Sequence, residues 1–286
     1  MNIFYGVLLG LIQGVAEFLP ISSSGHLALA ETILGAGKGG AAVAAMDGNA
    51  FFNIMLHLAT LVAVVIAYWD DVRDMILECV DMIRGLGRGE SLASRNVPTR
   101  RLILMIIVAT LPLFVIVPFH HAIESLNNIP WFIGVALLVT GLLLYLSDRM
   151  PRGGKTERDI TIVDALVIGL AQGLATIPGL SRSGTTITAG MSRGLNREFA
   201  VKFSFLMSLL SVLGAVVLSV VDVIKDGVDT SILPACLVGM VVAGVTGYFC
   251  IRLLQKIVRK GRFGGFAYYC WGVGALSILL ALVLKR

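Results

Sequence analysis

Charged side chains are scarce in this chain. Of its 286 residues, only 14% are Asp, Glu, Lys or Arg, whereas 57% are hydrophobic; a soluble domain carries roughly 25% charged residues. This scarcity excludes an ordinary water-soluble protein and indicates an integral membrane protein with lipids around it. The net charge of +5 does not indicate a nucleic-acid partner, because the basic loops of membrane proteins face an anionic lipid surface.

Cysteine is scarce as well. The four cysteines lie far apart, and the chain has neither a CxxC pair nor a Cys/His cluster: they are Cys79, Cys236, Cys250 and Cys270. This spacing excludes a cysteine-based zinc site and the disulfide framework of a small secreted domain. We expect the four thiols to pack as small apolar side chains.

Long apolar runs are abundant. A helix that spans a bilayer needs about 20 mostly apolar residues. Six runs reach about this length: 51–69, 102–119, 129–146, 203–221, 232–251 and 264–284. Two more apolar segments, 3–20 and 162–177, end in breaks rich in Ser, Gly and Pro, and a short apolar piece follows each break, at 27–34 and from about residue 185. The sequence therefore predicts six spanning helices and two interrupted ones.

The two interrupted segments carry the same pattern. Residues 10–26 read GLIQGVAEFLPISSSGH and residues 169–185 read GLAQGLATIPGLSRSGT; at a constant offset of 159 they align without a gap, and eight of seventeen positions are identical. Matching interrupted segments in two halves are typical of inverted repeats with a ligand site near the bilayer midplane. We predict one all-α integral membrane domain over 1–286, with an inverted-topology repeat at about 1–147 and 160–286. Each half is expected to be a re-entrant helical hairpin plus three transmembrane helices.

Lys and Arg gather in four connecting segments, which are 70–101, 148–160, 193–202 and 252–262. The intervening segments 35–50, 122–130 and 222–231 have at most one basic residue each. Because cytoplasmic loops are the basic ones, we place the four basic segments in the cytoplasm. The first hairpin then enters the membrane from outside and the second from the cytoplasm, and the three spans between them make the two halves inverted copies.

Polar side chains gather at both breaks. The first break carries Gln13, Glu17, Ser22, Ser23, Ser24 and His26, and the second carries Gln172, Thr176, Ser181, Arg182, Ser183, Thr185 and Thr186. A charged side chain costs about 2.5–3.5 kcal/mol at the centre of a membrane. Glu17 and Arg182 are therefore either functional or a structural ion pair that joins the two halves.

The breaks also have the features of an anion site. A helix that starts after a Ser-Gly turn presents free N–H groups to a phosphate, and the fork of Arg182 can bind phosphate oxygens. Together they predict a phosphate-binding site. His57 lies within a predicted span, where it either lines the same cavity or hydrogen-bonds a neighbouring helix.

The same residues match two motifs of a known family. The stretch QGVAEFLPISSSGH resembles the [E/Q]xxxE motif with its Ser/His stretch, and PGLSRSGTT resembles the PGxSRSxxT motif, of the bacterial undecaprenyl pyrophosphate phosphatases, the bacitracin-resistance family. The resemblance covers nearly the whole chain. It implies removal of the terminal phosphate from this polyprenyl pyrophosphate lipid, which recycles the carrier for cell-wall synthesis. It also implies a multi-pass protein of the bacterial cytoplasmic membrane whose active site opens to the outer face.

The resemblance also assigns roles by motif position. It implies catalytic roles for Glu17, Ser23, His26 and Arg182, and substrate-binding roles for Gln13, Ser22, Ser24, Ser181, Ser183 and Thr186. It implies a divalent cation as cofactor, Mg²⁺ or Ca²⁺, with Glu17 as its protein ligand. Some members of the family have Glu at the first motif position, where this chain has Gln13.

The residues leave the nucleophile open. Ser23 can attack with Glu17 or His26 as base, His26 can attack directly and form a phosphohistidine, or a cation-activated water can attack. A second class of protein also fits broken helices in inverted repeats, namely a transporter or flippase of a lipid phosphate or small anion. Transport needs no nucleophile, so the presence of Ser23 and His26 favours the phosphatase. A homodimer is compatible with the sequence, which does not specify the oligomeric state.

Single cysteines in a variant without the native cysteines test the orientation. We expect Asn128→Cys to react with a membrane-impermeant thiol reagent added to intact cells. Gly154→Cys should stay unreacted, because Gly154 lies in a basic segment that we place in the cytoplasm. In lysed cells both should react, which serves as the control. Labelling of Gly154→Cys but not of Asn128→Cys in intact cells would reverse the orientation.

Overall fold

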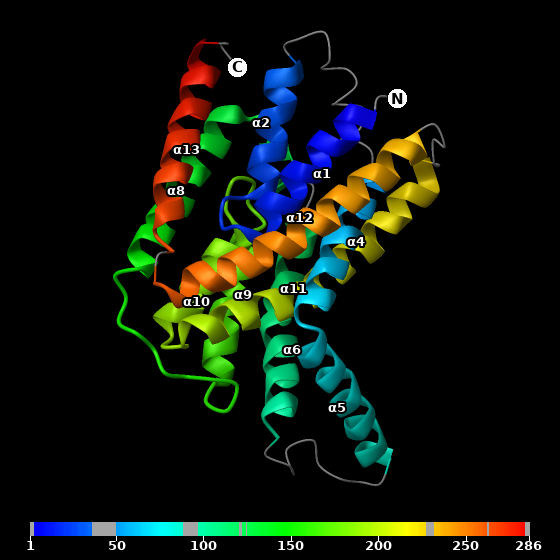
Figure 1. Ribbon diagram of the computed structural model, residues 1–286, viewed down its shortest axis with the longest axis vertical. Helices are drawn as coiled ribbons and strands as arrows, with labels where there is room; N and C mark the ends of the chain where they lie inside the picture. The colour runs from blue at the N-terminus through cyan, green and yellow to red at the C-terminus, as the bar shows by residue number, and fades with distance from the viewer. Residues whose placement is uncertain are drawn as a thin grey trace.

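The computed structural model describes residues 3–35, 50–87, 97–119, 122–123, 125–226, 232–261 and 263–283 (Figure 1). The α-helices are α1 (Ile3–Phe18), α2 (Ser23–Gly35), α4 (Ala50–Ala67), α5 (Trp69–Gly87), α6 (Pro98–Ile116), α8 (Pro130–Ser147), α9 (Ile162–Leu174), α10 (Arg182–Ser192), α11 (Arg197–Asp226), α12 (Leu233–Arg259) and α13 (Gly265–Val283). Two short 3-10 helices, η1 (Val117–Phe119) and η2 (Ser125–Asn128), lie between α6 and α8. No strand occurs among these residues, so the predicted all-α class is confirmed.

Within the described residues, five helices are long and apolar enough to cross a membrane: α6 continued by η1, α8, α11, α12 and α13. α4 occupies the remaining predicted span, and the chain then bends by 91° at Tyr68 into α5. α5 leaves the apolar side chains of Ile76 and Ile83 exposed between its charged residues. This pattern is typical of an amphipathic helix at a membrane surface.

The two interrupted segments form helical hairpins. In Figure 1 the start of α1 and the end of α2 both lie at the top of the molecule. The ends of the second hairpin also meet, because Lys155 before α9 and Leu195 after α10 form a β-bridge. One residue of the bridge belongs to the segment between α8 and α9, which passes through the lower left of Figure 1. The two hairpins therefore open toward different ends of the molecule.

The four basic segments meet at one end. Arg197 forms an ion pair with Asp148 at 3.5 Å, and Lys202 forms one with Asp71 at 3.0 Å. Arg259 of the last basic segment forms an ion pair with Glu198 at 3.2 Å. These contacts join parts of the chain that we placed together in the cytoplasm. Which side of a membrane this end faces stays a prediction.

Helices of the two halves interlock. α1 packs along α12 and α9 packs along α6, while α4 contacts both α11 and α12 and α8 contacts α13. At the aligned positions Gly10 and Gly169 the backbones touch: an added Cβ would overlap the carbonyl oxygen of Gly239 in the first case and of Ala109 in the second. The same pairing thus occurs in both halves, as a repeat would produce. The inverted symmetry itself stays a prediction.

An aromatic cluster lies in the core below the first break. Phe18 and Phe205 meet edge to face with ring centroids 5.6 Å apart, and Tyr68 lies 6.1 Å from Phe205. Because Phe18 directly follows Glu17 and Tyr68 is at the corner between α4 and α5, the cluster connects the first break to that corner. All four cysteines are free and three are buried, as expected.

Gly10→Ala tests the close approach of α1 and α12. We expect it to lower the free energy of unfolding by about 1–3 kcal/mol, the usual effect of overpacking, measured as a lower midpoint of thermal unfolding in detergent. Gly214→Ala is the matched control, because Gly214 is exposed within α11 with no atom within 4 Å of an added Cβ. It should be neutral or slightly stabilising, since Ala favours helix over Gly. Equal midpoints for both variants would contradict the close packing.

Candidate active site

The two breaks are capped in the same way. Ser22 Oγ accepts a hydrogen bond from the N–H of Gly25 at 3.3 Å, and at the aligned position Ser181 Oγ accepts one from Gly184 at 3.1 Å. A serine hydroxyl is a preferred N-terminal cap. The caps explain why α2 and α10 begin at Ser23 and Arg182, a few residues before the apolar pieces that the sequence indicated.

Each capping serine also lies within hydrogen-bond distance of the serine two residues later. Ser24 Oγ lies 3.3 Å from Ser22 Oγ, and Ser183 Oγ lies 3.3 Å from Ser181 Oγ. Ser22 has a φ of 72°, a left-handed conformation that is uncommon outside Gly. In this structure the four serines hold the two helix starts in shape. Their predicted role in binding substrate stays a prediction.

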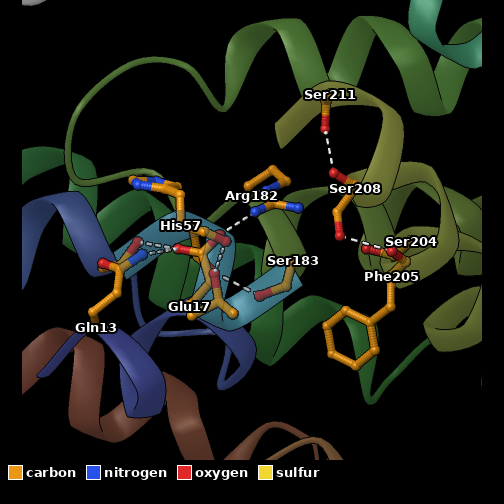
Figure 2. A network of polar contacts seen from close by, with 12 residues as sticks. Gln13, Glu17, His57, Arg182, Ser183, Ser204, Phe205, Ser208 and Ser211 are labelled. Carbon is orange, nitrogen blue, oxygen red and sulfur yellow. Dashed lines mark hydrogen bonds and ion pairs between the residues drawn. The ribbon is translucent and has the colours of Figure 1, made fainter. Parts of the chain in front are cut away.

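Glu17 is the centre of the site, in the last turn of α1. Its Oε1 accepts a hydrogen bond from Nη2 of Arg182, the first residue of α10, and this ion pair joins the two hairpins (Figure 2). Its Oε2 accepts from Ser23 Oγ at 2.7 Å and from Gln13 Nε2 at 3.2 Å. The carboxylate is only 7% exposed. The sequence had predicted this assembly, and the structure brings all four side chains together.

His57 of α4 lies in the same cluster (Figure 2). It is near enough to interact with the charge of Glu17, and its Nδ1 donates to the carbonyl oxygen of Asn53 at 2.8 Å. The sequence left open whether His57 lines the cavity or bonds a neighbouring helix; its hydrogen bond to Asn53 is within α4, and a role in the cavity stays a prediction. The signal that singled out His57 was its polarity within a spanning helix.

A cavity of about 10 Å³ adjoins the ion pair. Its polar walls are Glu17, Arg182, Thr60 and Ser208, from four different helices. That volume holds about one water molecule, so a phosphate group does not fit beside the closed ion pair. A phosphate can bind the paired Nη2 of Arg182 only if the carboxylate of Glu17 gives way.

Two predicted site residues, His26 and Thr186, have their hydrogen-bond partners outside the side-chain cluster around Glu17. His26 lies on the first turn of α2, but its ring nitrogens are hydrogen-bonded to the carbonyl oxygen of Ser22 and the hydroxyl of Tyr269. Thr186 Oγ1 donates to the carbonyl oxygen of Arg182 at 2.8 Å and lies 2.6 Å from Ser204 Oγ, which joins α10 to α11. The roles predicted for His26 and Thr186 stay predictions. Of the two predicted bases, the one hydrogen-bonded to Ser23 is Glu17.

The aligned glutamines have different surroundings. Gln13 bonds Glu17, but the residue that aligns with Glu17 is Thr176, whose hydroxyl donates to the carbonyl oxygen of Gly173 at 2.7 Å. Gln172 is buried without a hydrogen-bond partner in the described part of the chain. The site therefore combines a carboxylate from one hairpin with a guanidinium from the other.

The donor set bears on the expected cation. Over the described residues, no group of three or more His, Cys, Asp and Glu side chains could hold a metal ion. One oxygen pair does fit a hard cation: the carboxylate of Glu17 and the amide Oε1 of Gln13, which is buried and unpaired within the described ranges. Mg²⁺ is commonly bound by one or two carboxylates together with substrate phosphates. The residues fit a cation that is shared with a pyrophosphate.

Comparison with known proteins agrees with this geometry. Residues 6–276 match the model of one protein family, described as bacitracin resistance protein BacA. The chain belongs to this family. It is 40% identical to the undecaprenyl-diphosphatase of Alkaliphilus metalliredigens over 99% of this chain and 100% of that protein. It is 38% identical to the undecaprenyl-diphosphatase of Methanosphaera stadtmanae over the same shares of the two chains, and the resemblance inferred from the motifs is confirmed.

Proposed function

We propose that this chain is an undecaprenyl pyrophosphate phosphatase, which hydrolyses the lipid pyrophosphate to undecaprenyl phosphate and inorganic phosphate for carrier recycling in cell-wall synthesis. One observation carries the proposal: Ser23 Oγ donates to Glu17 at 2.7 Å, and Glu17 is paired with Arg182. A nucleophile, a proton acceptor and a phosphate-binding fork are thus in contact. The names of the relatives in the family support the same reaction.

The first step uses these three side chains. The terminal phosphate takes the place of Glu17 Oε1 on the guanidinium of Arg182, which binds phosphoryl oxygens in its planar fork. Ser23 Oγ then bonds to the terminal phosphorus, its proton moves to Glu17, and the bond to the bridging oxygen breaks, so that undecaprenyl phosphate leaves. Water then cleaves the phosphoserine and releases inorganic phosphate. Free N–H groups at the starts of α2 and α10 stabilise the charge.

Glu17 and Gln13 would hold Mg²⁺ or Ca²⁺ through their side-chain oxygens, together with oxygens of the pyrophosphate. The cation supplies charge neutralisation for the phosphoryl group. Without that help, the only positive side chain hydrogen-bonded to Glu17 in the described structure is Arg182. We therefore propose that the cation is brought to the site with the lipid substrate.

The proposed location is the bacterial cytoplasmic membrane, with the site open to the outer face. The grouping of Arg197, Lys202 and their partners at one end supports this orientation, because basic segments stay in the cytoplasm. The substrate headgroup then reaches Glu17 from the side on which the first hairpin opens.

Transport of a lipid phosphate is the alternative that the sequence left open. A transporter needs a carboxylate and a guanidinium, but it has no use for a hydroxyl hydrogen-bonded to that carboxylate. The contact between Ser23 and Glu17 therefore favours chemistry. Release of phosphate from undecaprenyl pyrophosphate by the purified protein in detergent, where transport has no two sides, decides between them; no release would refute the phosphatase.

Glu17→Gln keeps the shape of the side chain and removes its charge. We expect turnover to fall at least about 10²-fold, the scale of losing a key acid–base or electrostatic group, in the phosphate-release assay. Glu198→Gln is the control, because that carboxylate is 59% exposed and pairs with Arg259 on the surface. If Glu17→Gln keeps turnover and only its thermal stability falls, Glu17 and Arg182 form a purely structural pair.

Ser23→Ala and His26→Ala separate the two side-chain nucleophiles. If Ser23 attacks, Ser23→Ala should abolish turnover while lipid binding persists, and a rapid acid quench of the wild type should trap an acid-stable phosphoserine. His26→Ala should retain a measurable rate.

The competing mechanisms give other results. With His26 as nucleophile, Ser23→Ala keeps a rate, and the trapped phosphate is lost in acid. Substantial turnover in both alanine variants would exclude attack by either residue and leave a cation-activated water as the attacker.

A further inference from the structure

His26 has a partner outside both sequence motifs. Its Nε2 lies 2.8 Å from the hydroxyl of Tyr269, a residue of α13 that follows 243 positions later. The two rings are stacked, with centroids 5.6 Å apart and planes 8° from parallel. The other ring nitrogen, Nδ1, lies 2.8 Å from the carbonyl oxygen of Ser22.

These contacts determine where the ring carries its hydrogen. A carbonyl oxygen can only accept a hydrogen bond, so Nδ1 of His26 must donate to Ser22. In a neutral imidazole Nε2 then has a lone pair, which accepts the O–H of Tyr269. A doubly protonated ring would place a cation in the first turn of α2, at the positive end of the helix dipole. The contacts therefore favour the neutral form with hydrogen on Nδ1.

We propose that Tyr269 relays a proton in the reaction: the carbonyl of Ser22 holds His26 as the neutral Nδ1–H tautomer, and the hydroxyl of Tyr269 donates to Nε2, the ring nitrogen that can take up a proton. This inference rests on the proposed function and assigns His26 to its second step. Ser23 and His26 are three residues apart on α2, so they are neighbours on the helix surface, with Cβ atoms about 5–6 Å apart. A phosphate on Ser23 is thus next to the imidazole.

The second step is the hydrolysis of the phosphoserine by water. The oxygen of water bonds to phosphorus while the bond from phosphorus to Ser23 Oγ breaks. Glu17 returns to Ser23 the proton that it took in the first step, while the hydroxyl of Tyr269 passes its proton to Nε2 of His26 and takes the proton that the water loses. The hydroxyl of Tyr269 can turn and accept a hydrogen bond from the new Nε2–H, so the pair stays bonded. Glu17 and His26 thereby serve different steps.

A purely structural explanation of this contact also exists. Tyr269 is 46% exposed in α13, and a hydroxyl at membrane depth needs a hydrogen-bond partner. In that case the loss of the hydroxyl should change stability but leave the chemistry unchanged. A measurement of the second step distinguishes the two explanations.

Tyr269→Phe removes the hydroxyl and keeps the stacked ring. We expect kcat to fall about 10-fold, a modest loss for acid–base catalysis, with KM within about twofold of the wild-type value. Because the second step is slowed, the fraction of enzyme trapped as phosphoserine at steady state should rise. Tyr268→Phe is the control, since Tyr268 is 64% exposed and its ring meets Tyr145 and Trp271 instead.

Nitrogen-15 NMR of labelled histidine tests the tautomer without turnover. The chain has four histidines, and the His26 signals are those lost in His26→Gln. We expect hydrogen on Nδ1 in the wild type and in Tyr269→Phe, because the carbonyl of Ser22 still accepts it, and a changed Nε2 chemical shift in Tyr269→Phe, because the hydrogen bond from the hydroxyl is lost. Hydrogen on Nε2 in the wild type would overturn the proposal, as would a kcat and phosphoserine fraction in Tyr269→Phe equal to those of the wild type.

The two proposals can fail separately. If the wild type releases no phosphate, the proposed function is wrong, and the tautomer measurement still tests the contact between Tyr269 and His26. If the wild type is active, Glu17→Gln is inactive and Tyr269→Phe behaves like the wild type, only the inference about Tyr269 is wrong.

Discussion

The ion pair between Glu17 and Arg182 is the interaction on which the rest of the site depends. Each charge would be costly alone at the depth of the membrane, and each belongs to a different hairpin, so their pairing draws the two breaks together. Because Nη2 of Arg182 is already paired and the adjoining cavity is small, a substrate that binds this nitrogen must compete with a carboxylate. An anion with more charge than a carboxylate, such as a pyrophosphate, has the advantage in that exchange.

The sequence predicted those features that depend on local pattern. Apolar runs of spanning length predicted the spanning helices, and the repeated break predicted that Glu17, Ser23 and Arg182 lie near one another. The starts of α2 and α10 were expected a few residues too late, because apolar patterning does not register a helix turn built from polar residues. The serine caps at Ser22 and Ser181 make that turn helical.

What the sequence could not predict depends on contacts between distant residues. His26 and Ser23 are in the same motif, yet His26 bonds a tyrosine 243 residues away, and nothing in the composition of α13 distinguishes Tyr269 from its neighbour Tyr268. The proximity of His57 to Glu17 likewise depends on how α4 packs beside α1. Such pairings are decided by tertiary packing, about which periodicity and motif spacing carry no information.

The pairing of helices across the two halves has a consequence for motion. α1 of the first half lies against α12 of the second, with backbones in contact at Gly10 and Gly239, and α9 of the second lies against α6 of the first. Neither half can rock as a rigid body past the other without breaking these seams, although such rocking is how many proteins built from inverted repeats alternate between the two sides of a membrane. We therefore expect the movement that admits a ligand at the hairpin tips, where a side-chain rotation at Arg182 would part the charges. The packed helices of the two halves would then stay in place while the ion pair between the hairpin tips opens and closes.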